Sequence, residues 1–350
     1  MGYTFKNESY NILINQAGGL ELLVNELNPS QIIVLVDENT ENFCLHYLIS
    51  ELHRPFKTIS IRSGEANKNI DTCKFVWSSL IKFKADRKSL LINLGGGVIG
   101  DLGGFCAGTY MRGIDFIQMP TTLLSQVDAS VGGKLGVDFD GFKNMVGLFQ
   151  NPKAVIINTD FLKSLPYKEL LSGYAELLKH GLIASQTVWE ELSSVEDITT
   201  LDFDRIVHDS VMIKKTVTEE DPTEKGLRKI LNFGHTIGHA VETLSFETDR
   251  PLLHGEAIAI GIILESHLSM QKGYISEEDY QNIKTAIIKL YGNKAKSLPT
   301  IEQITEIMLL DKKNDQGKIQ FSLLNQIGQG NYNQEVDQEA LQAALSDYIQ

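Results

Sequence analysis

The chain has 350 residues, and two domains are the expectation because a single hydrophobic core rarely grows beyond about 250–300 residues. No apolar run reaches the roughly 20 residues that a membrane-spanning helix needs, which excludes a membrane-spanning protein. The net charge of −13 disfavours nucleic acid as a partner. The three cysteines, Cys44, Cys73 and Cys106, have no paired spacing, and we therefore expect free thiols in a cytoplasmic protein.

The first half of the chain alternates between strand-like and helix-like segments. The segments 40–52 and 67–84 are long enough for helices between strands, and this alternation predicts a mostly parallel sheet covered on both faces. The apolar, β-rich runs are 31–36, 57–61, 89–94, 116–119 and 154–158.

From about residue 166 the apolar spacing becomes helical, and 317–324 is the one segment that looks like strand. The predicted helices are 166–184, 203–219, 226–245, 254–272, 277–290 and 335–349. The sequence therefore predicts a Rossmann-like α/β domain over residues 1–162 and a mainly α-helical domain over residues 163–350.

A glycine-rich turn follows the strand-like run 89–94. Gly95, Gly97 and Gly100 have the spacing G-x-G-x-x-G, which at the start of a helix lets the backbone approach a phosphate closely. The pattern also occurs in simple packing turns. Polar residues at two other strand ends favour a nucleotide site: Asp37 follows the run 31–36, and a turn with Glu65 and Lys68 follows the run 57–61.

Histidines and carboxylates of the second half indicate a metal site. His235 and His239 are four residues apart and share one face if 226–245 is helical, although such a pair is more often an ordinary pair of hydrogen-bonded histidines. Further donors are His254 and Glu256, and Glu176 stands in an apolar segment where a carboxylate is costly unless paired or metal-bound. Three ligands of this type suit a catalytic zinc site, and spacing alone leaves all five residues open.

Basic residues gather near these motifs in an otherwise acidic chain. Lys134, Lys143 and Asn144 lie in the glycine-rich segment 125–149, while Lys214 and Arg228 flank the histidine segment. A further pair of lysines follows in the segment 311–315, "DKKND". A single surface lysine usually has no role, but this grouping indicates a pocket for phosphate and carboxylate.

These motifs together resemble the 3-dehydroquinate synthase family of sugar-phosphate cyclases over nearly the whole chain. The segments that carry the resemblance are "GGGVIGDLGGF", "RGIDFIQMPTTLLSQVDASVGGKLGVD", "KNMVG", "GYAELLKHGL", "EKGLRKILNFGHTIGHAVE", "HGEAIAIG" and "DKKND". The resemblance implies an N-terminal domain that binds NAD and a helical domain that carries Zn²⁺ or Co²⁺.

The resemblance also implies roles for individual residues. The metal ligands would be Glu176, His235 and His254. The catalytic residues would be Lys134, Glu224, Arg228 and His239. The substrate would contact Arg112, Asp128, Lys134, Asn144, Lys179, Lys214, Arg228, Asn232 and Lys312. NAD would contact Asp37, Glu65, Lys68, Gly95, Gly97, Val98, Ile99, Gly100, Asp101, Thr121, Thr122 and Lys143.

The implied substrate is a small anionic sugar phosphate, 3-deoxy-D-arabino-heptulosonate 7-phosphate. In the family, NAD transiently oxidises a ring hydroxyl, phosphate is eliminated, the hydride returns, and an intramolecular aldol reaction closes the carbocycle of 3-dehydroquinate. The family also implies a homodimer. The alternatives are a cyclase of the 2-deoxy-scyllo-inosose or valiolone type and a metal-dependent polyol dehydrogenase, which would not need the phosphate-binding lysines.

Overall fold

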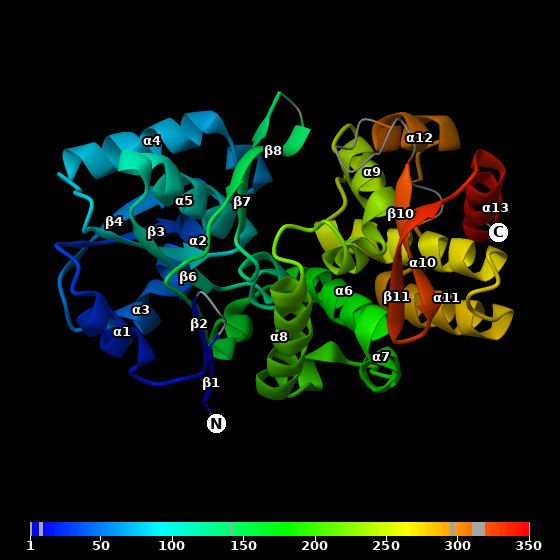
Figure 1. Cartoon of the computed structure of the whole chain (residues 1–350), viewed down its shortest axis with the longest axis horizontal. Helices are drawn as coiled ribbons and strands as arrows, with labels where there is room; N and C mark the ends of the chain where they lie inside the picture. The colour runs from blue at the N-terminus through cyan, green and yellow to red at the C-terminus, as the bar shows by residue number, and fades with distance from the viewer. Residues whose placement is uncertain (1, 7–9, 141, 295–297, 310–318, 350) are drawn as a thin grey trace. The chain divides into compact units, whose positions relative to one another are not determined.

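The computed structural model describes residues 2–6, 10–140, 142–294, 298–309 and 319–349. The chain forms two compact units, each built from two stretches of sequence. Unit 1 comprises Met1–Leu170 and Asp202–Lys215, and unit 2 comprises Leu171–Leu201 and Thr216–Gln350. Figure 1 colours the elements of both units along the chain. The segment 202–215 therefore belongs with the α/β unit, whereas the sequence places it within the helical domain.

Unit 1 is organised around a seven-stranded sheet with the order β1-β2-β9-β6-β5-β3-β4. Only the edge pair β1–β2 is antiparallel, and the other pairs are parallel. The predicted mostly parallel sheet is confirmed. The strands are β1 (Tyr3–Lys6), β2 (Asn11–Ile14), β3 (Ile32–Asp37), β4 (Phe56–Ile61), β5 (Leu90–Gly95), β6 (Asp115–Pro120) and β9 (Ala154–Ile157).

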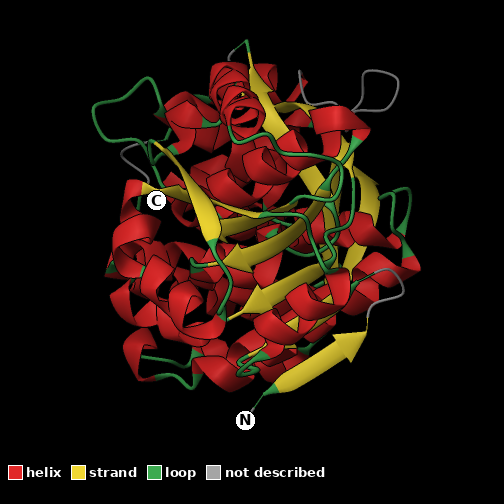
Figure 2. Cartoon of the chain, turned by 90° about the vertical axis from the view of Figure 1, so that its left-hand side faces the viewer, coloured by secondary structure: helices red, strands yellow, loops and turns green. Residues whose placement is uncertain are grey.

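Helices cover both faces of this sheet, and Figure 2 shows its strands as yellow arrows among red helices. Successive side chains of a strand point to opposite faces, so Val34 packs with α1 (Gly19–Leu27) and α3 (Leu45–Glu51). Leu35 packs on the other face with α4 (Ile70–Lys82) and α5 (Gly97–Thr109). Burial on both faces explains why the central strands are continuous apolar runs without polar alternation.

The strand order reverses direction between β3 and β5. The chain runs from β3 outward to the edge strand β4, passing through α2 (Glu38–Phe43) and α3, and then returns to form β5 on the other side of β3. In open parallel sheets, the crevice at the carboxyl ends of two such strands is the usual place for a ligand. The glycine-rich turn that follows β5 lies at this crevice.

The glycine-rich segment 125–149 forms an element that the sequence did not predict. Its residues make a π-helical turn, Ser125–Ala129, and the antiparallel hairpin of β7 (Lys134–Phe139) and β8 (Phe142–Phe149). The inner strand β7 buries Leu135 and Val137, which pack with α5. The outer strand β8 leaves Phe142, Met145 and Phe149 exposed.

Helix α8 (Phe203–Glu220) begins in unit 1 and ends in unit 2, because the two units divide at Lys215. Its first turn is attached to the sheet of unit 1 by hydrogen bonds. Asp204 accepts from Asn15 Nδ2 at 2.8 Å and from Thr159 Oγ1 at 2.5 Å. This attachment fixes the first half of α8, including Lys214, to unit 1.

Unit 2 is mainly helical and is built around α10 (His254–Gln271). Residues of α10 are buried along nearly its whole length, which explains why its sequence is apolar all round. The other helices are α6 (Tyr167–Ala184), α7 (Gln186–Ser193), α9 (His235–Ser245), α11 (Glu277–Tyr291), α12 (Ile301–Leu309) and α13 (Gln338–Ile349). A hairpin of β10 (Gln320–Gln326) and β11 (Gln329–Glu335) completes it.

The predicted helix 226–245 is wrong as a single element. Leu227–Asn232 is a 3-10 helix, and α9 starts afresh at His235 after Gly234, whose φ of 77° lies in the left-handed region. A Cβ at position 234 would also lie 2.6 Å from Ile262. The break places His235 at the very start of α9. Among the described residues, no helix combines the length and apolar character that crossing a membrane requires.

Candidate functional site

Four strand ends of unit 1 bring the predicted NAD residues to one edge of the sheet. Asp37 ends β3, Glu65 follows β4, and Gly95 ends β5. Thr121 follows β6, where its N–H donates to the carbonyl of Gly95 at 3.0 Å. Because β6, β5, β3 and β4 are consecutive neighbours in the sheet, these residues line adjoining strand ends.

The glycine-rich turn leaves room for a ligand at the start of α5. Gly96, the residue before the helix, makes no side-chain cap, and Gly97 opens the first turn. A Cβ added at Gly97 would meet only Ala129, at 3.8 Å, so the backbone is accessible there. At Gly95, by contrast, a Cβ would lie 2.5 Å from the Ile99 side chain. Gly95 is therefore needed for packing, whereas Gly97 suits close approach of a phosphate.

Asp37 has a structural duty besides its predicted contact with NAD. Its Oδ1 accepts from the N–H groups of Asn39 and Thr40, at 2.9 and 2.8 Å, and caps α2. Position 37 is thus held rigidly at the end of β3. The sequence signal at this position combines a helix cap with a possible ligand contact.

Lys68 is buried and joins residues predicted for two different ligands. Its Nζ lies 2.6 Å from Asp101 Oδ2 and 2.7 Å from Asn144 Oδ1. Burial by itself would lower the pKa of Lys68, but the Asp101 and Glu65 carboxylates raise it, so the group stays an ammonium. The predicted NAD residue Lys68 therefore lies beside the predicted substrate residue Asn144. Lys143 Nζ is 3.7 Å from Glu65 Oε1.

A second buried cation of unit 1 comes from α8. Lys214 Nζ lies 2.7 Å from Asp128 Oδ1 and also donates to the Asp128 carbonyl oxygen. Lys134 is exposed at the start of β7.

Arg112 does not lie at the edge formed by the carboxyl ends of the strands, because it follows α5 and precedes β6, at the amino ends of the strands. Its φ of 69° puts it in the left-handed region.

In unit 2, the structure brings together the three predicted metal ligands from three helices. Glu176 lies within α6, His235 begins α9, and His254 begins α10. Glu176 Oε1 is 3.4 Å from Nε2 of His235 and 3.4 Å from Nε2 of His254. Glu176 is fully buried, and Lys179 Nζ forms an ion pair with its Oε2. Neither carboxylate oxygen makes a hydrogen bond of normal geometry within the described structure.

Close packing of glycines explains how these side chains converge. A Cβ at Gly261 of α10 would lie 1.9 Å from the Gly234 carbonyl oxygen, and one at Gly255 would lie 2.0 Å from the Ser172 carbonyl oxygen. The backbones of α6, α9 and α10 therefore approach one another more closely than side chains would allow. Glu265 of α10 strengthens the contact by accepting from the N–H groups of Gly234, at 2.6 Å, and Ile237, at 3.0 Å.

The protonation states of His235 and Glu176 suit a divalent metal. His235 Nδ1 lies 3.0 Å from the Phe233 carbonyl oxygen, which can only accept, so Nδ1 carries the proton and Nε2 keeps its lone pair. Burial lowers the pKa of His235, as does Lys179. Burial would raise the pKa of Glu176, but Lys179 and His235 hold it well below its ordinary value. A carboxylate and imidazole nitrogens are the donors that zinc and cobalt accept.

His239 lies beside the same point. Its ring centroid is 5.0 Å from that of His235 and 5.8 Å from that of His254, and donor atoms of the three rings lie within 4.8 Å of one another. The geometry thus places a fourth donor next to the three predicted ligands. His239 can either complete the metal site or act on a substrate bound there.

The loop before α9 holds the other predicted residues of unit 2. Arg228 is buried and donates from Nη1 to the Pro222 carbonyl oxygen at 2.9 Å. Asn232 Nδ2 donates to Glu224 Oε1 at 2.7 Å. Both therefore lie on the 3-10 segment that leads directly into His235. Lys312 lies outside the described residues.

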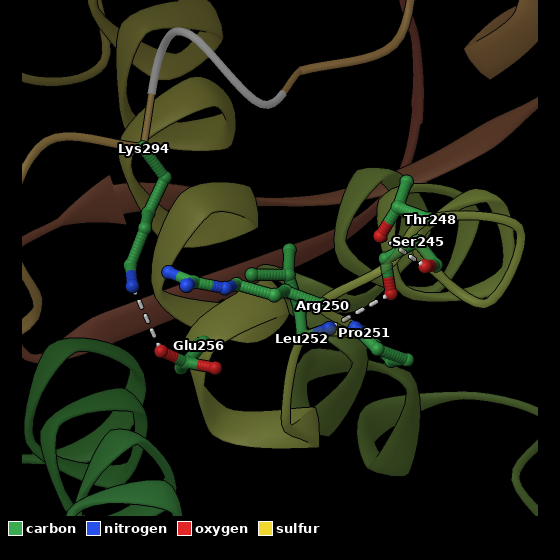
Figure 3. Close-up of a pocket in the computed structure, with 7 residues that line it drawn as sticks. All are labelled: Ser245, Thr248, Arg250, Pro251, Leu252, Glu256 and Lys294. Carbon is green, nitrogen blue, oxygen red and sulfur yellow. Dashed lines mark hydrogen bonds and ion pairs between the residues drawn. The ribbon is translucent and has the colours of Figure 1, made fainter.

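Glu256, a fifth candidate ligand in the sequence, belongs to a different feature. Its Oε2 accepts from the Leu253 N–H at 2.9 Å and its Oε1 pairs with Lys294 at 2.9 Å. The pair lines a cavity of about 300 Å³. Figure 3 shows the contact between Glu256 and Lys294 among the lining side chains. The lining residues are Ser245, Thr248, Arg250, Pro251, Leu252, Glu256 and Lys294.

Sequence reasoning missed two buried carboxylates, Glu242 on α9 and Glu265 on α10. Glu242 Oε2 lies 3.3 Å from His254 Nδ1, and Glu265 caps α9. A usable signal was present, because each acid interrupts an otherwise apolar segment of a helix. Glu242 also follows His235 by two helical turns, which puts both on one face of α9.

Two family models match consecutive parts of the chain. The model described as 3-dehydroquinate synthase N-terminal matches residues 58–172, and the one described as 3-dehydroquinate synthase C-terminal matches residues 173–314. The chain is 41% identical to the 3-dehydroquinate synthase of Parabacteroides distasonis over 94% of each chain. It is 40% identical to that of Alkaliphilus metalliredigens, over 86% of this chain and 85% of the relative.

Solved structures share the fold over the full length of the chain. A 2-epi-5-epi-valiolone synthase from Streptomyces hygroscopicus, with NAD⁺ and Zn²⁺ bound, has a TM-score of 0.86 at 24% identity, covering 99% of this chain and 98% of that one. A 2-deoxy-scyllo-inosose synthase, complexed with carbaglucose-6-phosphate, NAD⁺ and Co²⁺, has a TM-score of 0.81 at 23% identity, covering 99% of each chain. At these identities the likeness concerns the fold.

Proposed function

The chain belongs to the 3-dehydroquinate synthase family, and we propose that it converts 3-deoxy-D-arabino-heptulosonate 7-phosphate to 3-dehydroquinate and phosphate. The observation that supports this most is the convergence of Glu176 with Nε2 of His235 and of His254. The same chain carries an accessible glycine turn at the switch point of a parallel sheet. A catalyst for this reaction needs both a metal and a dinucleotide.

Glu176, His235 and His254 would hold a Zn²⁺ or Co²⁺ ion, which would supply a Lewis acid for a hydroxyl oxygen, and NAD bound at the glycine turn would supply reversible hydride transfer. The protein prepares these atoms in advance. Lys179 keeps Glu176 ionised, and the Phe233 carbonyl oxygen keeps the His235 Nε2 lone pair available. His239, beside the ligands, is positioned to move a proton on the substrate.

The turn residues Gly97, Val98, Ile99 and Gly100 would receive the pyrophosphate of NAD, and Gly95 would shape the turn through its packing against Ile99. The first-turn N–H groups of α5 point to that space, and no side chain caps them. Asp37, Glu65, Lys68, Asp101, Thr121, Thr122 and Lys143 lie at adjoining strand ends or beside them, where they would contact the rest of the dinucleotide.

The anionic substrate would be held by buried or tethered cations. Arg228 and Lys214 are both buried, and charge-assisted hydrogen bonds to phosphate or carboxylate are strongest where water is excluded. Their partners in the structure, the Pro222 carbonyl and Asp128, fix the cations before substrate arrives. Holding one conformer of a flexible sugar phosphate contributes to rate without any further catalytic group.

The decisive experiment supplies the heptulosonate phosphate with NAD and zinc, then measures phosphate and the carbocyclic product. We expect equal amounts of both, a requirement for only catalytic NAD, and no accumulation of free NADH. NADH that accumulates in proportion to product would instead identify a polyol dehydrogenase. Turnover of a hexose phosphate or heptulose phosphate without the carboxylate would identify a different cyclase.

We also propose that the chain acts as a cytoplasmic homodimer. The family resemblance supports a dimer, and β8 exposes Phe142, Met145 and Phe149, which are 41%, 44% and 58% accessible. The three cysteines are free and buried, which suits a reducing compartment. Sedimentation at several protein concentrations tests the dimer, and a monomer throughout would contradict it.

A further inference from the structure

The two histidines of the metal site differ in what lies behind them. His235 Nδ1 faces a neutral carbonyl oxygen, that of Phe233, at 3.0 Å. His254 Nδ1 faces a carboxylate, Glu242 Oε2, at 3.3 Å. In both rings Nε2 points to Glu176 Oε1. Each imidazole is therefore held from both sides, but at Nδ1 a carbonyl oxygen faces His235 and a carboxylate faces His254.

Glu242 is a buried carboxylate that contacts one of the predicted metal ligands. It lies on α9 and is 3% exposed. Burying a carboxylate is costly unless the charge is compensated. His254 contributes to that compensation, and a metal ion held by the same ring would add positive charge close to Glu242.

We propose that Glu242 is a positioning residue for metal binding, acting through His254. By accepting the Nδ1 proton, Glu242 fixes the tautomer in which the His254 Nε2 lone pair faces the metal, and it fixes the angle of the ring. Carboxylate–histidine–metal arrangements of this kind typically change metal affinity by about 10–100-fold when the carboxylate is removed. The inference rests on the metal site of the proposed function and adds a residue to it.

A purely structural role for Glu242 makes a different prediction. If the side chain only fills space between α9 and α10, a substitution should lower the unfolding temperature and leave the intrinsic metal affinity of the folded chain unchanged. If Glu242 acts through His254, the affinity should fall even where the fold is intact. Metal affinity, measured on the folded chain without substrate, separates the two roles.

The test uses Glu242→Gln and Glu242→Ala in the full chain. Glutamine keeps the size and one acceptor oxygen, whereas alanine removes both the charge and the acceptor. Zinc affinity is measured by competition with a chelator, and the Co²⁺ absorption spectrum reports whether His254 remains a ligand. We expect affinity to fall about 10–100-fold for Glu242→Ala and less for Glu242→Gln, with an altered Co²⁺ spectrum for alanine.

Glu265→Gln is the matched control, because Glu265 is a second buried carboxylate of the same helix pair that contacts backbone N–H groups. We expect it to lower the unfolding temperature while zinc affinity stays within about threefold of the unmodified chain, since it leaves the atoms around His254 in place. Equal loss of zinc affinity in the control and in Glu242→Ala would overturn the proposal, as would unchanged affinity in both Glu242 variants. If the unmodified chain binds neither zinc nor cobalt, the proposed function fails instead.

Discussion

The glycine-rich turn of unit 1 and the histidine cluster of unit 2 differ in how they are built. The turn leaves space for a ligand: a Cβ at Gly97 would have only Ala129 near it, and no side chain caps the start of α5. The cluster instead buries charge: Glu176 and Lys179 are almost completely inaccessible. The first site should therefore fail when atoms are added, and the second when charges are removed.

The two sites also differ in their effect on stability. An accessible turn can be altered without disturbing the sheet behind it, because the sheet core lies below the strand ends. A buried ion pair cannot lose one partner without exposing the other to an apolar interior. Function and stability are thus separable in the turn and coupled in the cluster.

The largest effect is expected from Glu176→Gln. Loss of the carboxylate should remove the buried charge that faces Lys179, at a cost of about 3–5 kcal/mol in the free energy of unfolding, and should abolish zinc binding and turnover. Urea unfolding and metal analysis measure both. The double variant Glu176→Gln with Lys179→Met should regain much of the stability but none of the metal. Unchanged stability in the single variant would show that the buried charges of Glu176 and Lys179 do not depend on each other.

Arg228→Ala should weaken substrate use by roughly ten- to a hundredfold, because one charge-assisted hydrogen bond contributes about 1.5–3 kcal/mol. NAD affinity should hardly change. Lys229→Ala is the neighbouring control, since the Lys229 ammonium contacts Asn333 Oδ1 instead. Steady-state kinetics with varied substrate and varied NAD distinguish the two ligands. A collapse of NAD affinity alone would reverse the assignment of Arg228.

Gly97→Ala should lower NAD affinity about tenfold, a loss near 1.4 kcal/mol, while the unfolding temperature stays the same. The added methyl group has open space in the protein but occupies the space of the phosphate. Gly95→Ala, by contrast, should lower the unfolding temperature, because its Cβ would lie 2.5 Å from the Ile99 side chain. Calorimetric titration with NAD and thermal unfolding give the pair of readouts. Equal behaviour of the two variants would count against a phosphate site at Gly97.

The smallest effect is expected from Asp221→Asn, in how stability depends on pH. Burial raises the pKa of Asp221, but N–H groups of Gly226, Lys225 and Arg228 outweigh this and hold the pKa below its ordinary value of 3.8. A lowered pKa means that this stabilisation is present above pH 3.8 and is lost as the pH falls through the folded-state pKa. Asp221→Asn should therefore lower the free energy of unfolding slightly near pH 7, and the difference from the unmodified chain should shrink as the pH falls below 3.8. Unfolding measured across that range tests this.

The sequence predicted the central parallel strands because they are buried on both faces and so read as continuous apolar runs, such as 31–36 and 89–94. It missed β8, whose residues are mostly exposed and whose glycine-rich neighbourhood has no strand periodicity. It also extended one helix across 226–245, because apolar spacing does not register that the carbonyl of Gly234 touches the backbone of α10 at Gly261.

The predicted site residues follow the same division. Residues that stand in short motifs, such as Glu176, His235 and His254, converge in the structure because three helices pack on glycines that the motifs contain. Arg112 lies at the other end of its strand, since a motif does not reveal which edge of the sheet it will occupy. Glu242 and Glu265 were passed over although each interrupts an apolar helix, because the sequence does not show which buried partner such an acid meets.

Helix α8 delays the completion of unit 1 while the chain is being synthesised. Unit 1 is closed by residues 202–215, whose Asp204 bonds with Asn15 and Thr159, yet residues 171–201 belong to the other unit. As the chain leaves the ribosome, unit 1 lacks α8 until residues 171–201 of unit 2 have been made. A fragment that ends at residue 170 would therefore lack part of unit 1, and residues 202–215 would have to be joined to it before unit 1 could be studied alone.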